Sequence, residues 1–581
     1  MKSTFSLMAI GSAISPLVSA TGFRTVGSSG SSAQMVFVPP YTNTVVFIDN
    51  YHANYGGPGY NISTGVHSDI SYLYDGTDIS VFGTEYNLTS NTIRPVKPLS
   101  NTFCSAGAFF PNGTLLNLAG AEAGTGVAEG FDKLRTYDAG PCNGACDTDW
   151  VEQPTKLQVY RWYPSAMTMV DGSVLVVGGS NKGGLVLNEA SINVPTYEIV
   201  HANGQAPKAP VLLPILNFTK AENLVANKSY NLYPMLHGLP NAAVQDHIFT
   251  VAGNQAVIWD YTNDVLVKTL PNTPLQPRTF PSLATSVLLP LEYPDYTPTV
   301  LMCGGASGDM PNPITLDDCY RINPLDDVPA WVADDNLPNG PQVMTDGIQL
   351  PNGKILFING ARKGCAGGYQ ADDPVLIPLL YDPYAAPGAR FTSMPPTTIP
   401  RLYHSTATLL PSGEVLVAGS NPAVSYSRTG AVPSTWPYFN NNGHRAALNQ
   451  QQNKTSHYPT EYRVDIFSPP YLSSISAHGR PVITTFPANI TYGTTFNIEA
   501  RLERGARIRG NVQINLLAHG FHTHGVSMGQ RMVKMGFQMV ANSYGITVHA
   551  PRDASVIPPG IYMLFVVEDN IPSVGQWISI A

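Results

Sequence analysis

The chain has 581 residues and a formal net charge of −8, and only 12% of its residues are charged. The absence of a basic excess argues against a nucleic-acid partner, and the 43% apolar content argues against a disordered chain. The length exceeds one ordinary core, so we expect several domains or one large closed architecture. The 52 glycines and 50 prolines favour many tight turns over long helices.

Residues 1–20 have the pattern of a signal peptide. Lys2 precedes an apolar run over residues 5–18, and Val18-Ser19-Ala20 supplies the small residues of a cleavage site. The run is too short to cross the ~30 Å hydrocarbon layer of a membrane. We therefore expect a secreted, extracellular chain without a membrane partner. Asn-x-Ser/Thr sequences fit a glycosylated surface and begin at Asn61, Asn87, Asn112, Asn217, Asn227, Asn453 and Asn489.

A turn, a short apolar strand and a glycine recur along the chain. The turn glycines lie about 60 residues apart, or about three times that distance in one case, and they are Gly113, Gly172, Gly353 and Gly413. The spacing predicts two weaker copies in the long interval, and residues 246–253 and 299–305 lie close to the expected places. A strand of the same kind occupies residues 44–49.

A period of about 60 residues with several strands per unit is typical of a β-propeller blade. The double glycines Gly178-Gly179 and Gly304-Gly305 resemble those of kelch motifs. The alternating segment 461–467 can pair with an N-terminal strand and close the ring. We therefore predict an all-β fold in which residues 21–470 form a seven-bladed kelch-like β-propeller. A solenoid is the competing repeat architecture, but it normally uses shorter units.

The last hundred residues contain short strands that follow a Pro-rich linker at residues 468–471. These apolar segments lie at residues 481–483, 496–500, 512–516 and 562–567. Their spacing is typical of a β-sandwich. We predict a separate C-terminal immunoglobulin-like domain over residues 480–581.

Six cysteines in a secreted chain favour disulfide bonds. Cys142 and Cys146 are close enough to close a small ring, and Cys303 and Cys319 flank a loop rich in glycine and proline. Sequence alone does not establish either connectivity. Cys104 and Cys365 remain, and we interpret Cys365 as a buried, inert thiol.

Three of the 13 histidines are clustered, at His519, His522 and His524. In a strand, His522 and His524 share one face and His519 lies on the other, so the pair is a moderate metal signal beside the alternative of solvated side chains. No serine-hydrolase elbow, phosphate loop or dinucleotide motif stands in a suitable setting. No acid/base pair of carboxylates is evident either, although such pairs can be distant in sequence.

Several longer motifs closely resemble those of the copper radical oxidases, and of the glyoxal oxidase branch in particular. They occur in the family's order over nearly the whole mature chain, at residues 101–107, 161–165, 350–367, 397–407, 459–463, 467–472, 523–524 and 529–531. The segment Arg401-Leu402-Tyr403-His404-Ser405 is typical of the glyoxal oxidase branch rather than of galactose oxidase.

The resemblance implies a set of site residues. Cys104 and Tyr163 would form a thioether-linked radical cofactor, and one copper ion would bind Tyr163, the axial Tyr403, His404 and His524. The C-terminal domain would therefore supply one ligand. Two imidazoles and two phenolates suit copper(II), whereas zinc has no redox chemistry. For His522 we expect a supporting or surface position rather than ligation.

The resemblance also implies the activity. A secreted oxidase of this kind would convert small aldehydes of the glyoxal and methylglyoxal type to carboxylic acids and reduce O2 to H2O2. Tyr403 would take the substrate proton and the oxidised Tyr163 would take hydrogen from carbon. Extracellular peroxidases that use the H2O2 are candidate partners, and we expect a monomer.

Two other functions are compatible with these features. One is an oxidase of primary, aryl or carbohydrate alcohols with the same site, and the other is a non-enzymatic kelch-type propeller that binds glycan or protein. The aromatic residue that shields the linked tyrosine in this family is not placed by the motifs. Residues 51–60 and Tyr72 are rich in tyrosine and lack tryptophan, which leaves the substrate preference open.

Overall fold

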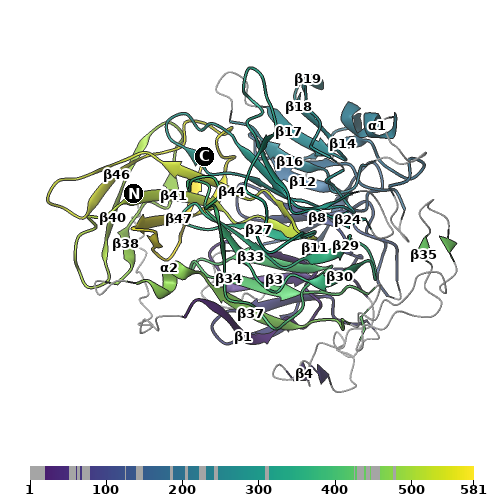
Figure 1. Cartoon of the computed structure of the whole chain (residues 1–581), viewed down its shortest axis with the longest axis horizontal. Helices are drawn as coiled ribbons and strands as arrows, with labels where there is room; N and C mark the ends of the chain where they lie inside the picture. The colour runs from purple at the N-terminus through teal and green to yellow at the C-terminus, as the bar shows by residue number, and fades with distance from the viewer. Residues whose placement is uncertain are drawn as a thin grey trace.

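The computed structural model describes residues 20–51, 60–61, 66–67, 79–124, 126–138, 140, 148–182, 188–202, 207–221, 230–240, 246–275, 277–307, 313–423, 426–427, 438–439, 445–446, 458–475 and 479–581. Cys142, Cys146 and all but the last residue of the predicted signal peptide lie outside these ranges. Helices in the described ranges are confined to α1 (Pro214–Ala221) and α2 (Pro470–Ser473). The predicted all-β class is confirmed (Figure 1). Neither of these helices has the length and apolar character needed to cross a membrane.

Seven antiparallel sheets of at least four strands lie between Gly22 and Ser468 in the described part of the chain, besides smaller two-stranded ones. The first contains β2 (Met35–Phe37), β3 (Thr44–Ile48), β6 (Gly83–Asn87) and β7 (Thr92–Pro95). The second contains β8 (Ala106–Phe109), β9 (Leu115–Leu118), β10 (Lys133–Tyr137) and β11 (Val151–Lys156). The third contains β12 (Ser165–Thr168), β13 (Val174–Val177), β14 (Thr196–Val200) and β15 (Val211–Leu212).

The remaining four sheets continue the same order. The fourth contains β16 (Met235–Gly238), β17 (His247–Ala252), β18 (Gln255–Asp260) and β19 (Val265–Leu270). The fifth contains β20 (Thr285–Leu288), β22 (Val300–Cys303), β25 (Cys319–Ile322) and β26 (Val332–Ala333). The sixth contains β27 (Asp346–Gln349), β28 (Ile355–Ile358), β31 (Leu379–Tyr381) and β32 (Phe391–Ser393). The seventh contains β33 (Ser405–Leu409), β34 (Val415–Gly419), β37 (Arg463–Ser468) and β1 (Gly22–Ser28).

The sequence repeat corresponds to the second strand of each sheet. The strongest copies become β9, β13, β28 and β34, the two weaker copies become β17 and β22, and residues 44–48 become β3. The turn glycines Gly113, Gly172, Gly353 and Gly413 all have φ between 81° and 88°. Glycine adopts this left-handed region without a steric penalty, which explains why the turn recurs with this residue.

The seventh sheet combines the two ends of this region. Strand β1 pairs with β37, and Gly22 lies opposite Ser468, so the predicted pairing of segment 461–467 with an N-terminal strand is confirmed. We call β2, β8, β12, β16, β20, β27 and β33 the leading strands. Neighbouring leading strands lie side by side, as β8 does with β12, and β33 of the seventh sheet lies beside β2 of the first.

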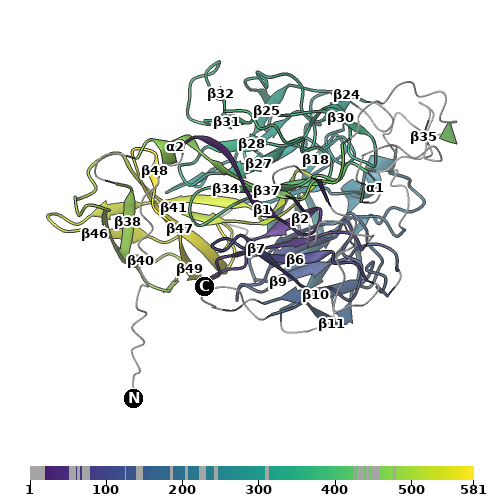
Figure 2. The same cartoon turned by 90° about the horizontal axis from the view of Figure 1, so that it is seen from below.

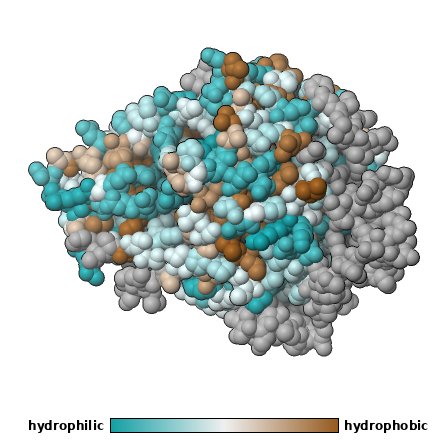
Figure 3. Space-filling view, viewed as in Figure 1, coloured by the Kyte–Doolittle hydropathy of each residue, from teal (hydrophilic) through white to brown (hydrophobic). Residues whose placement is uncertain are grey.

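Two further sheets lie in the C-terminal region, to one side of the other seven in both views (Figures 1 and 2). One contains β38 (Pro481–Thr485), β40 (Thr495–Leu502), β45 (Phe537–Met539) and β46 (Gly545–His549). The other contains β21 (Leu291–Glu292), β39 (Asn489–Ile490), β41 (Val512–Ala518), β44 (Arg531–Met535), β47 (Gly560–Glu568), β48 (Ile571–Pro572) and β49 (Gln576–Ile580). On the face shown in Figure 3, hydrophilic residues predominate and apolar residues are scattered.

One hairpin of the C-terminal region joins the first sheet instead of its own. Strand β42 (Phe521–Thr523) pairs with β2, and β43 (Val526–Met528) pairs with β42. The hairpin also contacts leading strands of other sheets, namely β8, β12, β20, β27 and β33. It is therefore inserted among the leading strands, where the largest of the apolar core clusters includes Phe521 and Met528.

Buried arginines hold the segments that enter the leading strands. Arg161 lies in the segment that leads into β12. It donates to the carbonyl oxygen of Gly178 at 2.8 Å and pairs with Glu198 at 3.0 Å. Arg278 and Arg401 make the equivalent contacts, with Gly304 and Asp318 and with Gly419 and Asp465. The carbonyl oxygen of the glycine at the end of the second strand thus accepts a hydrogen bond from an arginine side chain rather than from a neighbouring strand.

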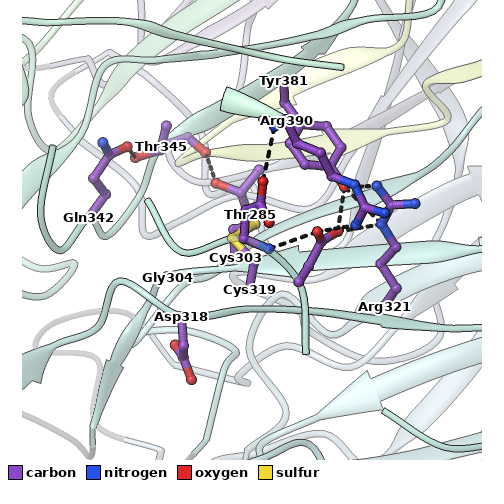
Figure 4. Close-up of a disulfide and its surroundings, with 12 residues drawn as sticks. Thr285, Cys303, Gly304, Asp318, Cys319, Arg321, Gln342, Thr345, Tyr381 and Arg390 are labelled. Atoms are coloured by element: carbon purple, nitrogen blue, oxygen red, sulfur yellow. Dashed lines mark hydrogen bonds and ion pairs between the residues drawn. A yellow bond between two sulfur atoms is a disulfide. The ribbon is translucent and has the colours of Figure 1, made fainter. Parts of the chain in front are cut away.

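The predicted Cys303–Cys319 disulfide is formed and links two directly opposed residues of β22 and β25 (Figure 4). Beside it, Asp334 pairs with both Arg321 and Arg390. The disulfide lies within the fifth sheet, whereas the ion cluster joins the outer part of that sheet to the sixth, because Arg390 immediately precedes β32.

We expect Glu198→Ala to lower the free energy of unfolding by about 3–5 kcal/mol, because it leaves the Arg161 guanidinium buried without its anion. Both side chains are fully buried. Lys363→Ala removes a solvent-exposed ion pair with Asp373 and should cost no more than about 1 kcal/mol. Denaturant unfolding measures both. Equal effects of the two substitutions would show that the buried pair does not stabilise the fold.

Candidate metal centre

The residues that enter the leading strands share one unusual backbone conformation. Cys104 and Tyr163 lie two residues before their strands and His404 directly before its own, with φ of 55°, 61° and 63°. Ala33 and Met344 occupy corresponding positions with φ of 52° and 60°. Because Ala33 and Met344 carry no polar side chain, the left-handed conformation belongs to the architecture of the sheets. The site uses positions that six of the seven sheets supply, all but the fifth.

Backbone hydrogen bonds link these positions from one sheet to the next. The amide of Tyr163 donates to the carbonyl of Cys104 at 3.2 Å, and the amide of Tyr233 donates to the carbonyl of Tyr163 at 2.8 Å. Such bonds offset the roughly 1–2 kcal/mol cost of a left-handed residue. They also place the side chains of successive sheets next to one another.

His524 reaches the same place from the C-terminal hairpin. It directly follows β42 with a φ of 54°. The Thr523 hydroxyl lies 2.6 Å from Nδ1 of His524, and it also donates to the carbonyl of Gln34 at 3.3 Å. The hairpin is thereby attached to the first sheet at the residue before the imidazole.

The structure brings all five predicted site residues together. The hydroxyls of Tyr163 and Tyr403 are 2.9 Å apart, and the Cys104 thiol is 3.6 Å from Nε2 of His524. One possible ligand atom each from Cys104, His404 and His524 lies within 4.8 Å of the others. All five side chains belong to residues that are 3% exposed or less. They come from three sheets and the inserted hairpin.

Both imidazoles are suited to binding a metal. Burial lowers the pKa of His404 to about 3 and that of His524 well below its usual value, so both rings are neutral near pH 7. Nδ1 of His404 lies 3.0 Å from the carbonyl of Asn421 and must carry the proton, because a carbonyl only accepts. The lone pair of Nε2 then finds no hydrogen-bond partner among the described residues. A buried acceptor without a partner destabilises the fold, and a metal ion bound to Nε2 would satisfy it.

The phenols complete a donor set that fits copper. Burial raises the pKa of Tyr163 and of Tyr403 well above the usual value, with an added contribution from the nearby Cys104. Two phenolates would therefore be unfavourable here without a compensating cation. A divalent ion supplies that charge, and mixed nitrogen and oxygen ligands suit copper(II).

Three aromatic neighbours of Tyr163 were not assigned to the site from the sequence. The ring of Trp162 lies 4.8 Å from that of Tyr163, that of Phe280 lies 4.6 Å away and that of Tyr233 lies 5.1 Å away. Tyr233 also lies 5.1 Å from the ring of His524. The repeated dipeptides Tyr163-Pro164 and Tyr233-Pro234 were a signal that could have indicated Tyr233.

One expectation about side-chain direction was wrong. His522 and His524 do not share a face, because β42 ends at Thr523 and His524 turns in the left-handed conformation. His522 instead lies against the Ser527 hydroxyl and the His519 carbonyl, at 2.9 and 2.6 Å.

A cavity of about 70 Å³ lies between the seven sheets and the C-terminal region. Residues at the far ends of the leading strands line it, such as Phe109, Thr168 and Gly238. Because the five site residues lie at the starts of these strands, the cavity is at the opposite end of the strands and none of the five lines it. It is therefore not the place where a substrate meets the metal centre.

The family model described as "Glyoxal oxidase N-terminus" matches residues 37–436, and "Galactose oxidase-like, Early set domain" matches residues 480–580. The chain belongs to the glyoxal oxidase family. It is 35% identical over 507 residues to aldehyde oxidase GLOX of Vitis pseudoreticulata, which covers 85% of this chain and 84% of the relative. Aldehyde oxidase GLOX1 of Arabidopsis thaliana is 34% identical, over 85% of this chain and 74% of the relative.

A solved structure supports the fold. A fungal alcohol oxidase of the AA5 family, described in complex with copper, superposes with a TM-score of 0.67 and 18% identity, over 97% of this chain and 100% of that one. The resemblance to the copper radical oxidases is confirmed by the family and its members. The prediction of an oxidase that uses a small substrate and dioxygen is confirmed with it.

We expect His524→Ala to abolish the rise in melting temperature that copper produces, because a ligand shared between the hairpin and the sheets binds only the assembled state. His522→Ala should leave most of that rise, since its ring contacts Ser527 and His519 instead of the centre. Each variant is melted with and without copper, so that a general loss of stability cancels. A larger loss of the copper effect in His522→Ala would identify His522 as the ligand.

Proposed function

We propose that this chain is a secreted copper radical oxidase that converts small aldehydes of the glyoxal and methylglyoxal type to carboxylic acids, with reduction of O2 to H2O2. The observation that carries the proposal is the convergence of two phenols, two neutral imidazoles and a thiol at one buried place. The names of the relatives from Vitis and Arabidopsis support aldehydes as the substrate class.

The proposed architecture is a closed seven-bladed propeller over residues 21–470 and an immunoglobulin-like sandwich over residues 480–581. The seven sheets would be the blades, and the contact of β33 with β2 supports closure of the ring. The match of the early set domain to residues 480–580 supports the second boundary. Residues 1–20 would direct secretion and be removed.

In the proposed centre, Tyr163, Tyr403, His404 and His524 would hold copper, and Cys104 would be joined to the Tyr163 ring through a thioether. The hydrogen-bonding contact between the Cys104 thiol and the Tyr163 hydroxyl supports this pairing. Copper, when bound, would supply one of the two one-electron centres that the reaction needs. The linked pair would supply the other, because sulfur delocalises an unpaired electron of the ring.

The residues divide the chemistry between a proton and a hydrogen atom. An aldehyde would react as its hydrate, and the Tyr403 oxygen would accept a proton from one hydroxyl group. The oxidised Tyr163 would take the hydrogen atom from the substrate carbon, and as this C–H bond breaks one of the two C–O single bonds of the hydrate would become the C=O double bond of the acid. The hydrate thus loses two electrons and two protons, which together reduce one O2 to one H2O2. The 2.9 Å between the two phenol oxygens supports action of both residues on one substrate carbon and its hydroxyl group.

The copper-loaded, oxidised protein should release H2O2 with glyoxal and methylglyoxal and form one carboxylic acid for each H2O2. Galactose and benzyl alcohol test the alternative of an oxidase of carbohydrate or aryl alcohols, and peroxide release in the same assay measures all four. Faster turnover of either alcohol than of both aldehydes would replace the aldehyde assignment with the alcohol one. Failure of all four substrates to yield H2O2 in the copper-loaded protein would contradict the proposed oxidase function.

Tyr403→Phe should reduce turnover by at least ~100-fold, which is the scale of a lost general base, while the ring still packs against His404. Tyr233→Phe is the matched control, because its hydroxyl donates to the Ser105 carbonyl, at 3.3 Å, and not to Tyr163 or Tyr403, and most activity should remain. Steady-state peroxide release and copper content are measured for both variants. Near-normal turnover in Tyr403→Phe would remove this residue from the proton transfer.

A further inference from the structure

Gln34 is a fully buried amide that contacts two parts of the proposed centre. It lies between Ala33 and the start of β2, in the first sheet. Its Nε2 atom is 3.2 Å from the Cys104 sulfur and 3.5 Å from Nε2 of His524, and its Oε1 accepts from the Cys104 amide at 3.2 Å. No motif in the sequence pointed to this residue.

The orientation of the amide follows from its partners. A backbone N–H can only donate, so the oxygen of Gln34 must face the Cys104 amide and the NH2 group must face the sulfur. The carbonyl of Gln34 also accepts from Thr523, whose hydroxyl lies against His524. Gln34 is therefore held at both its backbone and its side chain.

The two possible acceptors of the amide hydrogen differ once the centre is complete. In the proposed function, on which this inference rests, the Nε2 lone pair of His524 is used by copper and no longer accepts. A thioether sulfur still accepts weakly and cannot donate. The amide hydrogen of Gln34 is then left to the sulfur of Cys104, and both residues are fully buried.

We propose that Gln34 is a positioning residue that sets the reduction potential of the linked Cys104–Tyr163 pair by donating a hydrogen bond to the sulfur. The bond draws on the lone pair that the sulfur shares with the aromatic ring, so it opposes removal of an electron from the ring. Hydrogen bonds to cysteine sulfur tune the potentials of other protein redox centres in the same sense. Gln34 thus raises the potential of the pair and keeps the radical strongly oxidising.

The test is a redox titration of Gln34→Met, which keeps the length of the side chain without a polar group, and of Gln34→Leu. Each variant is titrated at the ferricyanide-to-ferrocyanide ratio that half-oxidises the wild-type protein. In the variants, the ratio of radical to reduced pair should be about fivefold higher than in the wild type, which is the equivalent of one ordinary hydrogen bond. The radical is measured by its optical absorption and paramagnetic signal, independently of turnover. An unchanged ratio in a folded, copper-loaded Gln34→Met protein would overturn the proposal.

Thr523→Val is the matched control, because it removes the hydroxyl that bridges Gln34 and His524 and leaves the amide and the sulfur in place. If Gln34 acts only by positioning His524, Thr523→Val will give the same rise, and the proposal is wrong. The intact mass reports the cross-link as a loss of two hydrogens. If the wild-type protein does not lose the two hydrogens, the proposed function itself is contradicted. If the wild type loses them but the Gln34 variants do not, Gln34 is needed to form the cross-link, and the proposal that it tunes the potential is wrong.

Discussion

The left-handed residue ahead of six of the seven leading strands, all but β20, is the constraint on which the rest of the site depends. It turns the chain so that side chains of several sheets point toward one another, and at Cys104 and Tyr163 a backbone hydrogen bond from the next sheet holds the residue there. Ala33 and Met344 adopt the conformation without any chemical role. A site of this kind therefore needs only suitable side chains at a few positions that the repeated sheets already orient.

Insertion of the hairpin β42–β43 among the leading strands makes the arrangement complete. The hairpin contributes His524 and adds Phe521 and Met528 to the largest apolar cluster. A ligand that enters in this way couples the C-terminal region to the sheets. Binding of the metal and docking of the hairpin must then favour each other, because neither part alone holds the whole donor set.

Burial determines the electrostatic character of the centre. Without a metal it favours neutral imidazoles, neutral phenols and a neutral thiol, since the charged form of each group is penalised. A cation reverses this preference for the phenols. Arg161 and Arg401 do not contribute their charge to the centre, because each is neutralised by a carboxylate of its own sheet. The arginines hold the strand entries and leave the charge at the centre to the metal.

Local patterns in the sequence determined a large part of this description. The turn glycines and apolar strands predicted the repeat and its two weak copies, because a left-handed turn and a buried strand are properties of a few adjacent residues. The motifs around Cys104, Tyr163, Tyr403, His404 and His524 predicted five residues that the structure brings together, and the loop between Cys303 and Cys319 made the observed disulfide a candidate.

The tertiary structure decided which side chains meet. His522 and His524 differ in direction because the strand ends between them, and this end depends on how β42 pairs with β2. Gln34 contacts Cys104 and His524, which lie 70 and 490 residues away. Phe280 reaches Tyr163 in the same way, from the segment ahead of the fifth sheet. Contacts over such separations follow from sheet pairing and backbone conformation, so the order of residues along the chain carries no local signal for them.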